Sequence, residues 1–186
     1  MSRRPVLLLS LVVGCSLAAC KRSEQPAPPP PSVPPAMAPG AGVDYKQRIQ
    51  AAQAVIAQDP KNVAAWIELG NDYFDTKQRE KAIDAYARAL DLEPNNPDVL
   101  TDQGVMYREI GEYQKAIANF ERANKLDPKH VQSLFNMGVV YSKDLKNPDK
   151  GIEAWRKVIE RAPTSPQAAQ AKQAIEEYKQ SAASRQ

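Results

Sequence analysis

A period of 34 residues runs through most of this 186-residue chain. Glycines, tyrosines and prolines recur together at this step: Gly70, Gly104 and Gly138; Tyr73, Tyr107 and Tyr141; Pro60, Pro94 and Pro128. Pro163 then follows Pro128 after 35 residues. Matching residues at one such period indicate an array of short structural units, each of which buries its apolar face against its neighbours. The period therefore predicts a repeat protein.

Each unit has the pattern of two helices joined by a turn. In the first unit, one face of the first helix is formed at helical spacing by Trp66, Leu69, Gly70 and Tyr73. Gly70 has no side chain, so a second helix can approach closely there. After a turn near residues 76–78, the second helix presents Ala82, Tyr86 and Ala89 on one face. Pro94 ends the unit, and Asn96 and Pro97 fit the cap and the first position of the next helix.

These residues closely resemble the tetratricopeptide repeat, whose pattern is a large residue, Leu, Gly, Tyr, Ala, an aromatic residue, Ala and Pro at fixed offsets. The resemblance divides the chain into units at residues 63–96, 97–130 and 131–164. It implies an all-α fold, a right-handed α-solenoid of three helix pairs. We expect an N-terminal flanking helix within residues 43–62 and a C-terminal capping helix within residues 165–186, which makes eight helices.

Two units depart from the repeat pattern. In the second unit, Gln103 stands where an apolar residue is usual, so we expect looser packing around it. The third unit contains one inserted residue, which we expect in the turn at residues 146–148, because a loop absorbs an insertion without harm. Gly151 and Val158 then replace two alanines of the pattern. In the capping helix, Ala169, Lys172, Ile175 and Tyr178 are spaced for packing on one side.

The first 19 residues have the pattern of a secretory signal peptide. Arg3 and Arg4 precede an uncharged, mostly apolar run from Pro5 to Ala19, which is shorter than the roughly 20 residues that span a bilayer. The run ends in Leu17-Ala18-Ala19-Cys20, which resembles the lipobox of bacterial lipoproteins. In that family the cysteine thiol is lipidated and the preceding peptide is removed. The resemblance implies that Cys20 is the lipidated first residue of the mature chain, and Cys15 is an alternative with a shorter apolar run.

Residues 20–42 follow as a proline-rich segment that holds eight of the sixteen prolines between Pro26 and Pro39. Its lack of large apolar side chains predicts a disordered tether, which in extended form reaches about 40 Å. The alternative is a docking ligand for an aromatic groove of a partner. The residue after the cysteine is Lys21, whereas an Asp there commonly retains Gram-negative lipoproteins at the inner membrane. The resemblance thus implies an outer-membrane protein that faces the periplasm, or the outer face of the cell membrane in a Gram-positive organism.

Charge and composition argue against several functions. Of 25 basic and 22 acidic residues, four bases and one acid precede Val43, which leaves 21 of each in the folding region. A nucleic-acid-binding domain needs a basic surface, so nucleic-acid binding is not predicted. His130 is the single histidine, and no residues show the spacing of a metal site or a catalytic triad. We therefore predict no catalytic residue, metal or cofactor, and we expect His130 to be a solvated turn residue.

Functional residues are expected on the first helices. In tetratricopeptide repeat proteins these helices line a concave groove that commonly binds a peptide segment. Carried onto this sequence, the groove positions are Ile67, Asn71, Phe74, Thr101, Asp102, Val105, Arg108, Phe135, Asn136 and Val139. Apolar side chains exposed among them would form a binding patch, unless they pack against the neighbouring capping helices. The basic clamp with which some repeat proteins hold a terminal carboxylate is not predicted, because only Asn71 fits it and Ile67, Asp102, Gln132 and Asn136 occupy its other positions.

The two resemblances together imply a membrane-anchored adaptor that recruits an envelope protein to its groove. Lipoproteins of this kind take part in pilus or secretion-pore insertion, outer-membrane protein assembly, cell-wall hydrolase scaffolding and cytochrome maturation, and the sequence does not choose among these. A second hypothesis is architectural: the array self-associates into a homo-oligomer and binds no peptide in the groove. An enzyme is the weakest hypothesis, because the sequence offers no candidate catalytic groups.

Overall fold

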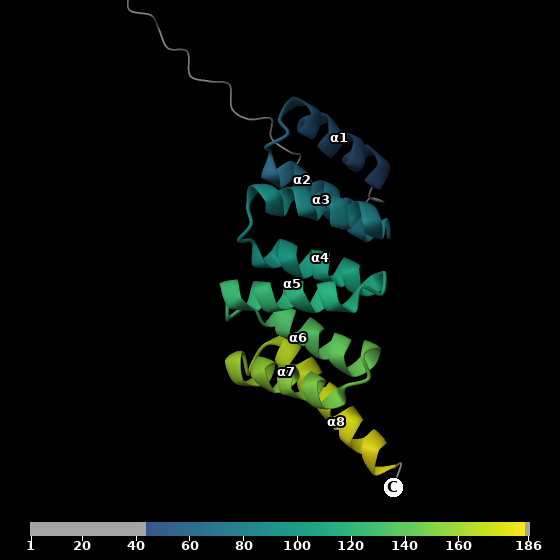
Figure 1. Ribbon diagram of the computed structural model, residues 1–186, viewed down its shortest axis with the longest axis vertical. Helices are drawn as coiled ribbons and strands as arrows, with labels where there is room; N and C mark the ends of the chain where they lie inside the picture. Colours follow the sequence, from purple (N-terminus) through teal and green to yellow (C-terminus); the bar gives the residue numbers. More distant parts are fainter. Residues whose placement is uncertain (1–43, 185–186) are drawn as a thin grey trace, which may run out of the picture. The chain divides into compact units, whose positions relative to one another are not determined.

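The computed structural model of the protein describes residues 44–184. This part of the chain consists of α-helices joined by short turns, with no β-strand (Figure 1). The predicted signal peptide (1–19), Cys20 and the tether (20–42) lie outside the described residues. The prediction of an all-α solenoid is confirmed by the helical architecture of the described residues.

Eight α-helices and one π-helical turn follow one another along the described residues. Their bounds are α1 (Tyr45–Gln58), α2 (Val63–Asp75), α3 (Arg79–Leu92), α4 (Pro97–Glu109), α5 (Tyr113–Leu126), α6 (Val131–Val139), η1 (Val140–Asp144), α7 (Pro148–Arg161) and α8 (Pro166–Ala183). We call α2, α4 and α6 with η1 the first helices of the three repeats, and α3, α5 and α7 the second helices. Each helix packs against the next one in sequence (Figure 1).

The two helices of each repeat touch at a glycine. A Cβ atom added to Gly70 would lie 2.5 Å from Tyr86 Cε1, and one added to Gly104 would lie 2.5 Å from Phe120 Cε1. A Cβ atom on Gly138 would collide with the indole of Trp155. The aromatic residue of each second helix therefore occupies the place where a side chain of the first helix would lie, as the sequence predicted.

The helix starts follow the expected capping chemistry. The side chains of Asn62 and Asn96 accept hydrogen bonds from the amides of Ala65 (3.0 Å) and Val99 (3.1 Å), and Ser165 Oγ accepts one from Ala168 (3.1 Å). The carbonyl groups of the prolines between repeats are also satisfied by side chains. Trp66 Nε1 donates to the Pro60 carbonyl (3.0 Å), Arg122 donates to that of Pro94, and Arg161 donates to that of Pro128 (3.1 Å).

The inserted residue of the third repeat lies in the first helix, so its predicted place in the loop was wrong. The turn between the two helices of each repeat has one residue at positive φ: Lys77 (60°), Gly111 (83°) and Lys146 (55°). In the first two repeats the next amide donates to a carbonyl five residues back, from Gln78 to Tyr73 and from Glu112 to Tyr107, both at 2.8 Å. In the third repeat Asn147 donates to Tyr141, six residues back, at 2.8 Å. The extra residue is therefore accommodated in η1 as a π-helical turn, and the loop keeps its conformation.

Gln103 is not a site of looser packing. Its side chain is buried, donates to the Ile83 carbonyl (3.0 Å) and accepts from Asn119 Nδ2 (2.8 Å). A hydrogen-bonded polar residue therefore takes the place of the usual apolar one, and it joins α4 to α3 and α5.

The capping helix α8 packs through a face that overlaps the predicted one in part. Ala168, Ala171 and Ile175 are buried, and Tyr178 is half-buried with its ring centroid 5.9 Å from that of Trp155. Ala169 and Lys172 are exposed, so these two residues of the predicted face were wrong. The other side of α8 is polar, as the end of a repeat array requires. No helix among residues 44–184 has both the length and the hydrophobicity that a membrane span requires.

Candidate interaction surface

The predicted binding residues fall on the surface formed by α2, α4 and α6, which we call the first-helix face. Nine of the ten are partly buried: Ile67, Asn71, Phe74, Asp102, Val105, Arg108, Phe135, Asn136 and Val139. Thr101 is only 3% exposed, and its hydroxyl donates to the Pro97 carbonyl at 2.8 Å. Thr101 therefore belongs to the interior of the repeat rather than to its surface.

The apolar members of this face belong to the edges of two cores. Ile67, Phe74 and Val105 pack against the core around Tyr73 and Tyr86, while Phe135 and Val139 pack against the core around Trp155. The rings of Phe135 and Trp155 have their centroids 6.3 Å apart. These side chains thus have a structural role and also retain some exposed surface. The alternative in which they pack against neighbouring helices holds in part.

Arg108, a predicted binding residue, forms an ion pair within the protein. Its guanidinium donates to both carboxylate oxygens of Asp144, at 2.5 Å from Nε and 3.3 Å from Nη2. Both side chains are mostly buried. The pair connects the end of α4 to η1, so the single base that the sequence placed on this face is neutralised by an acid of the next repeat.

Asp102 lies near the middle of α4 beside Asp98 and His130. The pKa of Asp102 is raised from 3.8 to about 6, mainly by burial and also by the neighbouring Asp98, while His130 acts to lower it. His130 Nε2 lies 3.0 Å from Asp98 Oδ1, and its Nδ1 is buried without a hydrogen-bond partner in the described structure. The His130 side chain is only 15% exposed, so its prediction as a solvated turn residue was wrong. It occupies the position where asparagine caps the other two first helices, and it joins α6 to α4 instead.

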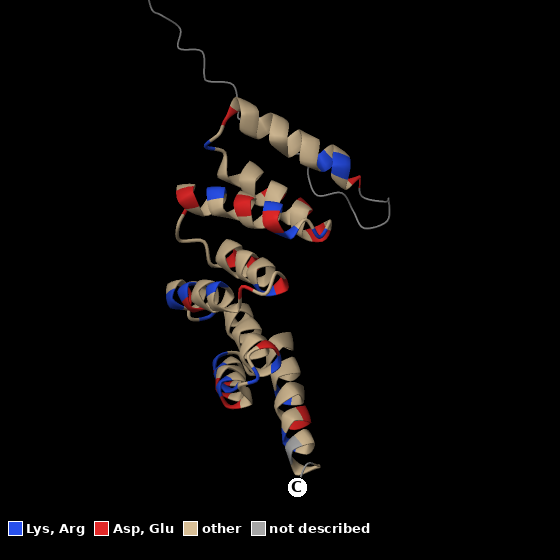
Figure 2. Cartoon of the chain, turned by 45° about the vertical axis from the view of Figure 1, so that its right-hand side comes forward, with Lys and Arg blue, Asp and Glu red and all other residues tan. Residues whose placement is uncertain are grey.

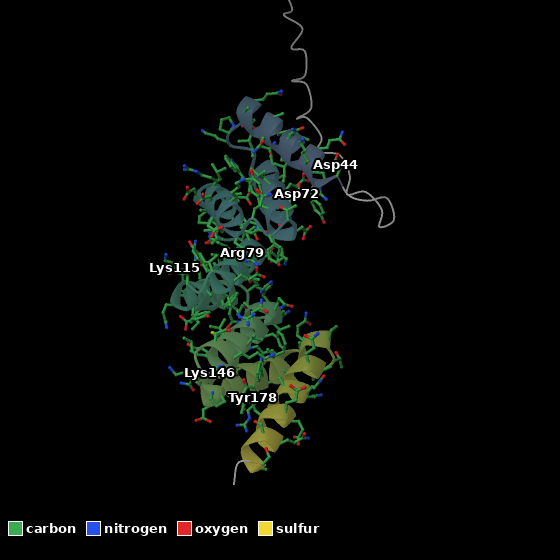
Figure 3. All side chains as sticks on the ribbon, turned by 90° about the vertical axis from the view of Figure 1, so that its right-hand side faces the viewer. Asp44, Asp72, Arg79, Lys115, Lys146 and Tyr178 are labelled. Atoms are coloured by element: carbon green, nitrogen blue, oxygen red, sulfur yellow. The ribbon has the colours of Figure 1, made fainter. Side chains whose placement is uncertain are left out.

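A second acidic group lies on α2, where Glu68 and Asp72 face Arg48 of α1. Asp72 is 1% exposed and lies 2.8 Å from the Arg48 guanidinium, and Figure 3 labels it among the side chains of α2. Burial raises the pKa values of both Asp72 and Glu68, while Arg48 lowers them. Arg48 is therefore committed to a buried carboxylate, and it ties the flanking helix to the first repeat.

The hydroxyl of Tyr86 connects these two acidic groups. It donates to Asn71 Oδ1 at 2.8 Å. Burial is the main cause that raises the pKa of Tyr86, followed by the charges of Asp102, Asp75 and Asp72. The negative charges of α2 and α4 therefore both act on the Tyr86 hydroxyl, which lies between the two helices. Asn71, a predicted groove residue, is held in place by this tyrosine of the second helix.

The first helices of the first two repeats differ in charge from the second helices. Figure 2 marks the charged residues along the chain. Helices α2 and α4 contain six acidic residues and one basic residue, whereas α3, α5 and α7 contain ten basic and seven acidic residues. The balanced net charge of the folding region thus conceals an acidic first-helix face in the first two repeats and more basic second helices.

Surface clefts also occur on the side of the second helices. One cleft of about 650 Å³ has Trp66, Leu69 and Tyr73 among its lining residues, together with the charged residues Arg88 and Asp91 of α3. A lysine of the second helix covers the tyrosine of each repeat: Lys81 over Tyr73 (5.4 Å), Lys115 over Tyr107 (5.5 Å) and Lys150 over Tyr141 (5.4 Å). These lysines shield the tyrosine rings on that side.

The sequence prediction missed Glu68, Asp98 and the role of His130. Glu68 precedes Asp102 by 34 residues, so the position that identified Asp102 in the second repeat also identifies Glu68 in the first. The 34-residue period was therefore enough to predict Glu68 as a surface residue. The contact between His130 and Asp98 had no such signal, because it depends on how α6 packs beside α4.

Comparison with known proteins agrees with the geometry. Family models described as tetratricopeptide repeats match residues 63–96, 85–118, 104–144 and 132–165. Helix pairs with a glycine contact at a 34-residue period are the defining structure of this class. The chain belongs to the tetratricopeptide repeat family. No curated protein matched the sequence in a similarity search.

Solved structures share the fold. The crystal structure of MamA is 29% identical, with a TM-score of 0.66, and the match covers 71% of this chain and 75% of MamA. A tetratricopeptide repeat protein from Parabacteroides merdae is 23% identical, with a TM-score of 0.63 and coverage of 72% of this chain and 53% of that one. The first tetratricopeptide repeat of Spaghetti (RPAP3), bound to the HSP90 peptide SRMEEVD, is 22% identical, with a TM-score of 0.59 and coverage of 67% and 96%. The family and these neighbours support a protein-binding role.

Proposed function

We propose that this chain is a lipid-anchored adaptor of the bacterial cell envelope, which binds a segment of a partner protein on its first-helix face. The observation that carries the binding role is the row of half-buried apolar side chains on successive first helices, Ile67, Phe74, Val105, Phe135 and Val139. Apolar side chains that line one face at the repeat period form a continuous surface for an extended or helical segment. The Spaghetti structure, which contains a bound peptide on the same fold, supports this mode of binding.

The proposed anchor rests on the sequence Leu17-Ala18-Ala19-Cys20 at the end of an apolar run. Acylation at the Cys20 thiol and at the new amino group gives several acyl chains, which anchor a protein stably where one chain is marginal. Lys21 favours the outer membrane in a Gram-negative organism, and the proline-rich tether would hold the repeats away from the membrane surface.

Site-specific photo-crosslinking in the native cell tests the binding role. A photoreactive residue at Val105 should give a discrete crosslinked band, and one at Lys115 on α5 should not, because Lys115 lies over Tyr107 on the side of the second helices. Because Val105 contacts the core, a probe there can disturb folding, so a second probe is placed at Asn136. Bands at twice the mass of the protein would support self-association instead. The absence of a crosslinked band from both Val105 and Asn136 would contradict the proposed binding surface.

The anchor has its own test. Cys20→Ser should abolish labelling by radioactive palmitate and release the protein from membranes, while Cys15→Ser should change neither. Labelling that persists in Cys20→Ser would contradict the lipid anchor and leave the binding role untouched.

A further inference from the structure

The first-helix face carries uncompensated negative charge over α2 and α4. Four carboxylates of these helices, Glu68, Asp75, Asp98 and Asp102, have no lysine or arginine within ion-pair distance in the described part of the chain. Asp75 accepts a hydrogen bond from Tyr45, and Asp98 lies against His130. Neither contact supplies a permanent positive charge.

The basic side chains near this face already have partners within the protein. Arg48 faces Asp72, and Arg108 is bound to Asp144. Arg79 pairs with Glu109 at 2.7 Å. Lys77 lies over the ring of Phe74, 5.6 Å from its centroid, at the end of α2 that is distant from Glu68 and Asp98. The middle of the face therefore keeps its negative potential.

Apolar and acidic positions alternate along this part of the face. Ile67 and Glu68 are neighbours on α2, and Asp102 lies one helical turn from Val105 on α4. Asp98, with its side chain 81% exposed, lies at the start of α4. A segment that crosses α2 and α4 thus meets apolar surface and carboxylates together. Anionic surfaces such as nucleic acid or acidic lipid are repelled by the same charges.

We propose that the segment bound by α2 and α4 is basic, a stretch in which lysine or arginine side chains accompany apolar ones. This inference rests on the proposed binding function of the first-helix face. Its basis is charge complementarity: Glu68 and Asp102 stand at the same position of successive repeats. Arg48, the cation beside Glu68, is bound to the buried Asp72, and His130, beside Asp102, lies against Asp98. A basic segment supplies the cations that these partly buried carboxylates lack.

Peptide binding to the full chain, purified in detergent, tests the proposal. The probes are two fluorescent peptides of equal length and equal leucine content, one with lysine and one with glutamate at the remaining positions. Fluorescence anisotropy should show binding of the lysine peptide, weakened by added salt, and no binding of the glutamate peptide. Binding of both peptides alike would overturn the proposal.

Paired variants locate the binding. Glu68→Gln with Asp102→Asn should weaken binding of the lysine peptide by about tenfold, because two carboxylates that face it lose their charge. Burial already opposes the ionised form of both groups, so these neutral variants should fold. The matched control, Asp84→Asn with Asp91→Asn on exposed positions of α3, should leave the affinity unchanged. An equal loss in both double variants would show non-specific attraction to acidic groups and overturn the proposal.

Crosslinking in cells separates this proposal from the function on which it rests. The Val105 crosslink should fade in the Glu68→Gln, Asp102→Asn variant and persist in the α3 control. A Val105 crosslink that persists undiminished in both would overturn the basic segment while the binding function stands. Absence of a crosslink from every probe on the first-helix face would contradict the binding function itself.

Discussion

The second and third repeats differ where the first helix ends. In the second repeat, α4 runs without interruption to the turn at Gly111, and Ala116 packs beneath it. In the third repeat, η1 contains one more residue, which places Ser142 against α7 at the position equivalent to Ala116, where Gly151 now stands. Ser142 Oγ donates to the Gly138 carbonyl at 2.8 Å. The first helix therefore accommodates the inserted residue, and a glycine in the facing helix makes room for it.

The largest expected effect comes from restoring the usual alanine in the third repeat. A Cβ atom on Gly151 would collide with Ser142 Oγ and lie 2.9 Å from the Gly138 carbonyl oxygen. Gly151→Ala should therefore lower the free energy of unfolding by about 3 kcal/mol, measured by urea denaturation. Deletion of the exposed Lys143 removes the extra residue and should make the alanine tolerated. If Gly151→Ala alone leaves stability unchanged, the packing of η1 against α7 is not as described.

Removal of the two ion pairs that join successive repeats should lower the free energy of unfolding by different amounts. Arg108–Asp144 joins the second repeat to the third through mostly buried groups, whereas Arg79–Glu109 joins the first to the second through more exposed ones. Arg108→Ala should lower the free energy of unfolding by about 1.5 kcal/mol, and Arg79→Ala by less than about 1 kcal/mol. Urea denaturation of the two variants side by side measures the difference. Equal effects would contradict a stronger connection at η1.

An effect smaller than that of Arg108→Ala is expected at the position occupied by Asp102 in the second repeat and by Asn136 in the third. The pKa of Asp102 is about 6 in the folded protein and near 3.8 when unfolded, so the folded state binds the proton more tightly. Its stabilising contribution is complete below pH 4 and is lost as the pH rises through 6. Asp102→Asn should remove this pH dependence and raise the stability at pH 7.5 by about 1 kcal/mol.

Thermal unfolding of the wild type and of Asp102→Asn at several pH values between 4 and 7.5 measures this effect. Asp98→Asn serves as the control, because Asp98 is largely exposed and its loss should leave most of the pH dependence in place. Parallel curves for the wild type and Asp102→Asn would show that the carboxyl titrates alike in the folded and unfolded states.

Much of this fold could be predicted from the sequence because repeat packing is local. Gly70 and Tyr86 meet within one helix pair, and the period repeats that contact, so helix order, caps and turns followed from the residues. The π-helical turn could not be predicted, since a sequence shows that a residue is inserted but not which element bends to hold it. The candidate surface was predicted by position, whereas its charge depended on the pairing of Arg108 with Asp144 across repeats.

Within residues 44–184, the connections between repeats join residues about one repeat apart, and this has a consequence for how the repeats fold. The hydrogen bond from Arg161 to Asn124 joins residues 37 apart, about one repeat, and the other connections between repeats are of similar length. A chain with contacts of such short sequence separation loses little entropy in forming any one of them, so it folds quickly. A helix pair can form as soon as all of its own residues have been synthesised. Each completed pair then offers an apolar surface on which the next pair packs. A chain that emerges N-terminus first during its synthesis can therefore fold progressively, one helix pair after another.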